Sequence, residues 1–101
     1  MKILWIVNSV LNNLSLNLYK KPSNGVWMDA LLDDFKNKEE YKIVVATTIK
    51  TRRTVQFIDG NITYYALPNN VPLLYNENKK SNIRAWQILL EEEKPDLIQV
   101  W

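Results

Sequence analysis

The sequence predicts an α/β domain built on an open, mainly parallel sheet. Three largely apolar runs, at residues 3–7, 43–46 and 97–101, show no regular polar alternation, and strands of this kind need cover on both faces. Two amphipathic segments between these runs predict two main helices. An Asp-Gly pair between two further strand-like stretches predicts a β-hairpin. We therefore expect a four-stranded core in the order 3-2-1-4, with the hairpin at one side.

The composition limits the chemistry that is open to this chain. Its 101 residues suit one domain, and 47% apolar with 24% charged residues is ordinary for a globular protein. A net charge of +2 is too small to predict nucleic-acid binding. The chain has no cysteine and no histidine, which excludes disulfides and leaves Asp, Glu, Lys or Tyr for any acid–base role. With no signal peptide and no apolar run of membrane-spanning length, we expect a cytoplasmic protein.

A long polar loop and a helix follow the first strand. The loop covers residues 9–24, a length typical either of a functional loop or of a flexible surface loop. The helix is expected over Gly25–Phe35. Ligands of open α/β sheets bind where loops leave the carboxyl ends of the strands, and helix N-termini attract anions. We therefore expect the ligand-binding face to include Asn8, Ser9, Asn24 and Gly25, although Gly25 could equally be a simple cap or turn residue.

The second half of the chain predicts the hairpin, a second helix and a last strand. The hairpin turn is Asp59-Gly60-Asn61, between the strand-like stretches 54–58 and 62–66. Two prolines argue against a regular helix within residues 67–80, so the second helix is expected to begin near Ser81. Its buried face should consist of its large apolar residues, Ile83, Trp86, Leu89 and Leu90.

Familiar catalytic and cofactor motifs are absent from the sequence. The only glycines are Gly25 and Gly60, so there is neither a G-x-G-x-x-G fingerprint nor a P-loop. A histidine-dependent triad is excluded as well. Asp33 and Asp34 are adjacent on the first helix, which is more typical of a solvated face than of a catalytic pair. We expect no catalytic residue, no metal ligand and no bound cofactor in this chain.

Several segments resemble the N-terminal half of a GT-B glycosyltransferase, and most closely the retaining enzymes of the family 4 type. These segments are Met1–Val7, the polar loop to Gly25 with the helix after it, and the run Glu92–Trp101, which is similar to the strand leading into an acceptor-side loop in that family. The resemblance covers the whole chain in order. The family usually has a doubled glycine where this chain has Asn24-Gly25.

The resemblance implies that residues 1–101 form one Rossmann-like domain, the acceptor side of a two-domain enzyme that moves a sugar from a nucleotide sugar to a glycan or other acceptor. Gly25 would approach the donor's diphosphate or the transferred sugar, and Asn8 and Ser9 would face the acceptor. Because that family's C-terminal domain holds most of the donor, this chain is expected to be inactive alone. Its implied partners are a nucleotide sugar and a glycan acceptor, with no nucleic acid and no metal. The implied process is surface-glycan assembly, with peripheral contact at the inner membrane face.

The alternative interpretation is a non-catalytic α/β module that binds a nucleotide or a protein partner through the same loops. A further expectation concerns the last strand, whose apolar residues are Leu97, Ile98, Val100 and Trp101. With nothing beyond it, this strand would be an exposed apolar edge, and such edges tend to pair with a second chain. We expect the isolated fragment to form a homodimer through this edge. The competing expectation is a monomer whose last strand frays.

Overall fold

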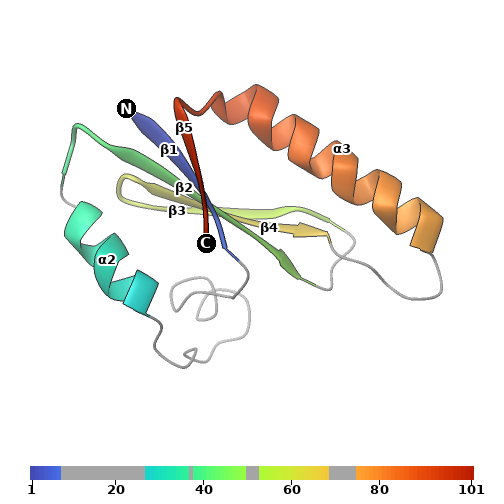
Figure 1. Ribbon diagram of the computed structural model, residues 1–101, viewed down its shortest axis with the longest axis horizontal. Coiled ribbons are helices and arrows are strands. Elements are labelled where there is room, and N and C mark those ends of the chain that lie inside the picture. The colour runs from blue at the N-terminus through green and yellow to red at the C-terminus, as the bar shows by residue number, and fades with distance from the viewer. Residues whose placement is uncertain (8–26, 37, 50–52, 69–74) are drawn as a thin grey trace.

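The computed structural model describes residues 1–7, 27–36, 38–49, 53–68 and 75–101, with only the backbone described for residues 27–28 and 75–82. Five strands and two helices make up these residues (Figure 1). In chain order they are β1 (Lys2–Ile6), α2 (Trp27–Phe35), β2 (Lys42–Ile49), β3 (Val55–Asp59), β4 (Ile62–Pro68), α3 (Tyr75–Glu93) and β5 (Leu97–Val100). The α/β class predicted from the apolar runs is confirmed.

All five strands belong to one mixed sheet in the order β3-β4-β2-β1-β5. β1 pairs in parallel with β2 and β5, and β2 pairs in parallel with β4, whereas β3 and β4 are antiparallel. The four parallel strands β4, β2, β1 and β5 follow the predicted order 3-2-1-4, with the hairpin at one side. The sheet differs from the prediction because it is five-stranded and mixed: the first hairpin arm, β3, pairs antiparallel with β4 and forms the edge strand.

The two helices cover opposite faces of the sheet (Figure 1). Successive residues of a strand point to opposite faces, so each strand contributes to two clusters. On the α2 face, Leu32 packs with a buried set that includes Trp5 and Tyr64. On the α3 face, Leu89 packs with a second set that includes Leu4. The central strands are therefore buried from both sides, as their continuous apolar sequence predicts.

A two-residue turn, Gly60 and Asn61, joins β3 to β4. Gly60 has φ +60°, a left-handed conformation that glycine adopts readily and that suits the first position of a hairpin turn. The Asn61 side chain is a structural anchor that the sequence did not reveal. Its Nδ2 donates to the carbonyl oxygens of Phe35 at 2.8 Å, Tyr41 at 2.9 Å and Lys38 at 3.2 Å. The hairpin is thereby tied to the connection between α2 and β2.

Helix α3 departs from its prediction in both its start and its buried face. It begins at Tyr75 rather than near Ser81, because Pro72 lies before its first residue and nothing in residues 75–80 breaks a helix. The residues that pack most deeply are Ala85 and Leu89, whereas Ile83 and Leu90 are exposed. Leu89 and Trp86 pack on the sheet side as predicted, and the small Ala85, one turn before Leu89, packs there with them.

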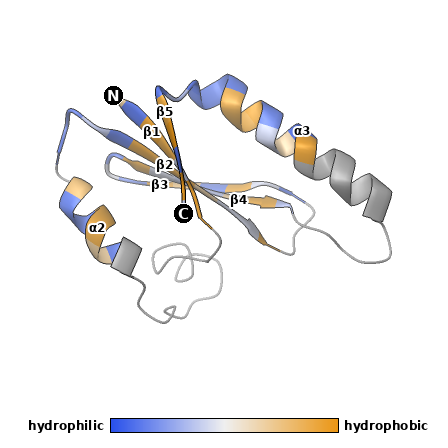
Figure 2. Cartoon of the chain, viewed as in Figure 1, coloured by the Kyte–Doolittle hydropathy of each residue, from blue (hydrophilic) through white to orange (hydrophobic). Residues whose placement is uncertain are grey.

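Helix α3 ends in a left-handed residue, and β5 follows at once. Lys94 has φ +44°, and its N–H donates to the Leu90 carbonyl at 3.0 Å, which closes the last turn. Strand β5 is largely hydrophobic in composition (Figure 2). The side chains of Leu97, Ile98 and Val100 are all exposed. Trp101 differs from the predicted exposed edge because it is half-buried, with its ring 5.2 Å from that of Trp5 in an edge-to-face arrangement.

Candidate functional site

The order of connections creates a switch point between β1 and β5. From β1 the chain passes through α2 on one face and reaches β2, on one side of β1. From β4 it passes through α3 on the other face and reaches β5, on the opposite side of β1. In open α/β sheets, a crevice opens at the carboxyl ends of two neighbouring strands whose connections leave in opposite directions, and ligands bind there. The candidate site is therefore the carboxyl edge of β1 and β5.

Two backbone hydrogen bonds hold the strand ends at this edge. The Val7 N–H donates to the Ala46 carbonyl at 3.0 Å, which fixes the end of β1 against β2. The Trp101 N–H donates to the Ile6 carbonyl at 2.9 Å, which fixes the end of β5 against β1. Val7 is buried, so the backbone reaches the edge in a fixed direction. The loop that follows Val7 therefore starts from a rigid support.

The four residues predicted for the site, Asn8, Ser9, Asn24 and Gly25, lie outside the described residues. Their chain neighbours are placed, however. Asn8 directly follows Val7 at the switch point, and Gly25 comes two residues before the first described residue of α2. The assignment of these four residues to the site stays a prediction.

Thr47 is a polar residue at the same edge that the sequence interpretation missed. It lies near the carboxyl end of β2, it pairs with Ala66, and its exposed fraction is only 2%. The alternation along β2 places it on the α2 face, the face that Val7 also joins. The available signal was the Thr47-Thr48 pair directly after an apolar run, because polar residues at the carboxyl end of a parallel strand often serve a ligand.

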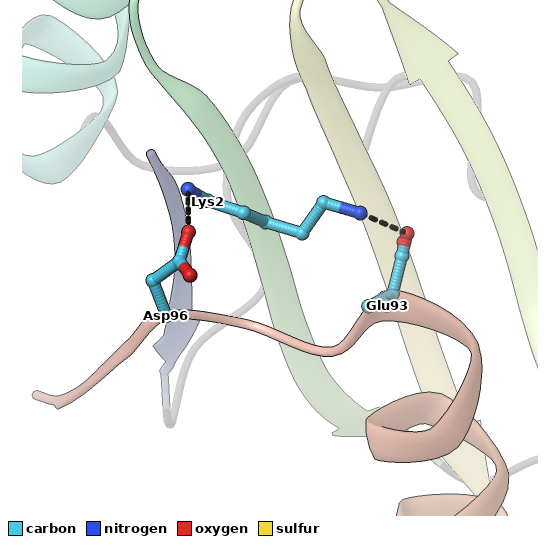
Figure 3. A network of polar contacts seen from close by, with 3 residues as sticks. All are labelled: Lys2, Glu93 and Asp96. Atoms are coloured by element: carbon cyan, nitrogen blue, oxygen red, sulfur yellow. Dashed lines mark hydrogen bonds and ion pairs between the residues drawn. The ribbon is translucent and has the colours of Figure 1, made fainter.

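A small polar network lies at the amino end of β1, opposite the candidate site (Figure 3). The Lys2 backbone N–H donates to Asp96 Oδ2 at 2.8 Å, and the Asp96 N–H donates to the Lys2 carbonyl at 2.8 Å. Lys2 Nζ also lies 3.8 Å from Glu93 Oε1, at the end of α3. A hollow of about 260 Å³ lies beside this network, lined in part by Lys42, Asn61 and Thr63. The network joins β1, α3 and β5 behind the switch point.

Neither a group of metal ligands nor a membrane-spanning helix is found among the described residues. Among those residues, no three acidic side chains gather closely enough to hold a metal ion. None of the described helices combines the length and the apolar character that crossing a membrane requires. Glu93 belongs to the polar network with Lys2, so the acidic run at the end of α3 has at least one structural partner.

Comparisons of the chain with protein-family models, with curated proteins and with solved structures each find no match.

Proposed function

We propose that this chain is the N-terminal, acceptor-side domain of a GT-B glycosyltransferase that moves a sugar from a nucleotide sugar to a glycan or other acceptor. The observation that carries the proposal is the switch point between β1 and β5, together with the polar loop that starts directly after Val7. In this proposal Asn8 and Ser9 face the acceptor, and Gly25 approaches the diphosphate or the transferred sugar. The enzyme would act in the cytoplasm, with contact at the inner membrane face.

Exposed apolar side chains on β5 and α3 support the proposal that this chain is part of a larger enzyme. On the α3 face, Ile98 and Val100 of β5 are 51% and 66% exposed. Ile83 and Leu90 of α3 are exposed too, and at 100° per residue they share one side of the helix, away from Ile88 and the side that faces β3. Apolar side chains of this kind usually receive a further packed element. We propose that additional parts of the enzyme cover this strip, and that the isolated chain instead pairs through β5 with a second copy.

Binding to the carboxyl edge can be tested with the isotope-labelled chain in solution. UDP-glucose and GDP-mannose are titrated separately while the backbone amide resonances are followed. We expect saturable shifts at Val7, Thr47 and Trp101, and none at Lys2 or Gly60, which lie at the opposite edge. Saturable shifts confined to the opposite edge would contradict the proposal. UMP is the control for the sugar, because equal binding of UMP favours the alternative of a nucleotide-binding module.

The coding sequence after Trp101 separates the two candidate functions. About 200 or more further residues with a second series of alternating strands and helices would supply the missing donor domain and favour the enzyme. A stop codon at that position would favour the non-catalytic module. In the extended enzyme, we expect Gly25→Val to lower transfer sharply while the thermal midpoint stays nearly unchanged.

Gly60→Val is the matched structural control for that experiment. The backbone of Gly60 is left-handed, so a branched side chain there should lower the thermal midpoint. If Gly25→Val lowers the midpoint as much as Gly60→Val does, Gly25 has a structural role and its assignment to the site is wrong.

A further inference from the structure

A second hollow lies on the α3 face, away from the switch point. Its volume is about 280 Å³, and it opens between α3 and the hairpin strands β3 and β4. Its apolar lining comes from Ala85, Ile88 and Leu89 of α3. The polar groups around it come from three elements: Thr54 and Gln56 at β3, Tyr65 of β4 and Glu92 of α3. Polar groups that converge beside an apolar lining are the usual composition of a small-ligand site.

Tyr65 is the central polar group of this hollow. The residue is only 4% exposed, and its ring packs into the α3-side cluster. The structure records no hydrogen bond from the Tyr65 hydroxyl to any described residue. The Tyr65 hydroxyl is not among the buried side-chain atoms that lack a partner, so it is open to the hollow, where a ligand can reach it. Burial, and then the carboxylates of Glu93 and Glu92, raise the pKa of Tyr65 to about 12, so the phenol keeps its proton at neutral pH and can both donate and accept.

The charge around the hollow selects among ligand classes. Glu92 lines it and Glu93 lies on the next residue of α3, so an anionic ligand is disfavoured. The other polar groups are neutral: two hydroxyls and one amide. These groups match the hydroxyls of a polyol, and Ile88 offers an apolar surface to its C–H groups. A volume near 280 Å³ is at the low end for ligand pockets and suits one sugar ring.

We propose that the hollow between α3 and β3 binds a neutral monosaccharide unit through Tyr65, Gln56 and Glu92. This inference does not depend on the transferase proposal, because the hollow lies on the α3 face near the β3 edge and the switch point lies at β1 and β5. The two sites are reported by different amides. Sugar at this site should shift Gln56, Tyr65 and Ile88, whereas the ligand of the switch point should shift Val7 and Trp101.

The test is a titration of the labelled 101-residue chain with D-glucose, D-mannose and D-galactose. For a ligand of this size we expect a dissociation constant of roughly 1 mM, with saturable shifts at Gln56, Tyr65 and Ile88 for at least one sugar. Glucose 6-phosphate should bind more weakly because its phosphate meets Glu92. Absence of saturable shifts for all three sugars would overturn the proposal. Tighter binding of glucosamine than of glucose would also overturn it, by identifying a cation site.

Single substitutions distinguish an effect on sugar binding from an effect on the stability of the fold. Tyr65→Phe removes only the hydroxyl and should weaken sugar binding about tenfold, the effect of losing one hydrogen bond to a ligand. Its thermal midpoint should not fall, because that hydroxyl has no described protein partner. Tyr64→Phe is the matched control, since Tyr64 lies one residue away on the opposite face and should leave sugar binding unchanged.

A further variant keeps the test decisive if Tyr65→Phe folds poorly. Gln56 is exposed, so Gln56→Ala should fold normally and still weaken binding. Unchanged sugar affinity in both the Tyr65 and the Gln56 variants would overturn the proposal.

Discussion

The two edge strands of this sheet, β3 and β5, differ in the side chains that they expose to solvent. At the β3 edge, Val55 and Phe57 pack into the core while Gln56 between them faces solvent, and Asp59 pairs with Lys36 at 2.9 Å. At the β5 edge, Leu97, Ile98 and Val100 are exposed on both faces of the strand. Edge strands that carry alternating polar residues and charges resist pairing with other chains, whereas apolar ones invite it. On β3 the one large apolar side chain that is exposed is Ile58, whereas β5 exposes three, so β5 is the edge strand better suited to contact with another chain.

The largest expected effect is on dimer formation, and a matched pair of substitutions on the two edge strands tests it. Val100 and Ile58 are 66% and 67% exposed, one on each edge strand. If the isolated chain pairs through β5, Val100→Lys should weaken the dimer at least about tenfold, because a buried side chain of this size contributes roughly 1.5–3 kcal/mol. Ile58→Lys should leave the dimer intact. Light scattering over a concentration series measures both.

That comparison would fail in two ways. A monomer mass for the unmodified chain at high concentration, with fast amide exchange at Val100 and Trp101, would replace the dimer by a fraying strand. Equal weakening by both substitutions would mean that contact is not confined to β5.

Alkaline pH should weaken the β3 side through Tyr65, which pairs with Gln56 of β3. Its pKa is raised from 10.0 to about 12, so between these values the folded chain retains a proton that the unfolded chain has lost. The contribution is present below pH 10 and is lost as the pH rises towards 12; because solvent screens this group, we expect a fall of about 1 kcal/mol in the free energy of unfolding. Urea unfolding at pH 9 and pH 11.5 measures it. Tyr65→Phe should lack this part of the pH dependence, and an identical dependence in that variant would contradict the assignment.

The Asn61 side chain, which ties the hairpin to the connection between α2 and β2, should contribute to the stability of the fold. Asn61→Ala removes a donor to three carbonyl groups and should lower the free energy of unfolding by about 1–3 kcal/mol. Asn61→Asp is the matched variant, because it keeps the shape but cannot donate, so it should be at least as destabilising. Urea unfolding midpoints compare the two. If Asn61→Asp is as stable as the parent, the donor role is wrong.

The smallest expected effect concerns the polar network behind β5. Asp96→Ala removes the acceptor of the Lys2 N–H, and because this bond is exposed the loss should be about 1 kcal/mol or less. Amide exchange should accelerate along β5 and leave β3 unchanged. Equal acceleration on both edge strands would show that the network supports the whole sheet rather than the β5 edge.

The sequence predicted the strands better than it predicted their neighbours. The apolar runs located β1 and β5 to within one residue and β2 to within three, and Asp59-Gly60 located the hairpin. Sequence periodicity could not tell that β3 belongs to the sheet, because a hairpin arm reads the same whether or not its partner pairs onward. For the buried face of α3 the sequence was right about Trp86 and Leu89, whereas Ile83 and Leu90 are exposed and small Ala85 faces the sheet instead. Side-chain size along a helix does not reveal how closely that helix approaches its neighbours.

The sequence could predict that the candidate site lies at the carboxyl edge of the sheet, but not which described residues form it. Parallel strands and their helices direct attention to the carboxyl ends, and the described part of that edge includes Thr47 and Trp101, neither of which was assigned to the site. Thr47 was read as strand, and Trp101 as an apolar edge residue. Asn8, Ser9, Asn24 and Gly25 stay predictions, since they lie outside the described residues.

The position of β1 in the middle of the sheet has a consequence for biosynthesis. Met1 contacts Glu40, 39 residues away, whereas Lys2 contacts Asp96, 94 residues away. During translation β1 is made first, it gains one neighbour when β2 appears, and its other side waits until β5 is made. A nascent chain that has passed β4 but not β5 therefore exposes an unpaired strand with apolar flanks, the state that chaperones recognise and that aggregates most readily. Slow codons shortly before Asp96 would lengthen that exposure, and rapid synthesis of α3 and β5 would shorten it.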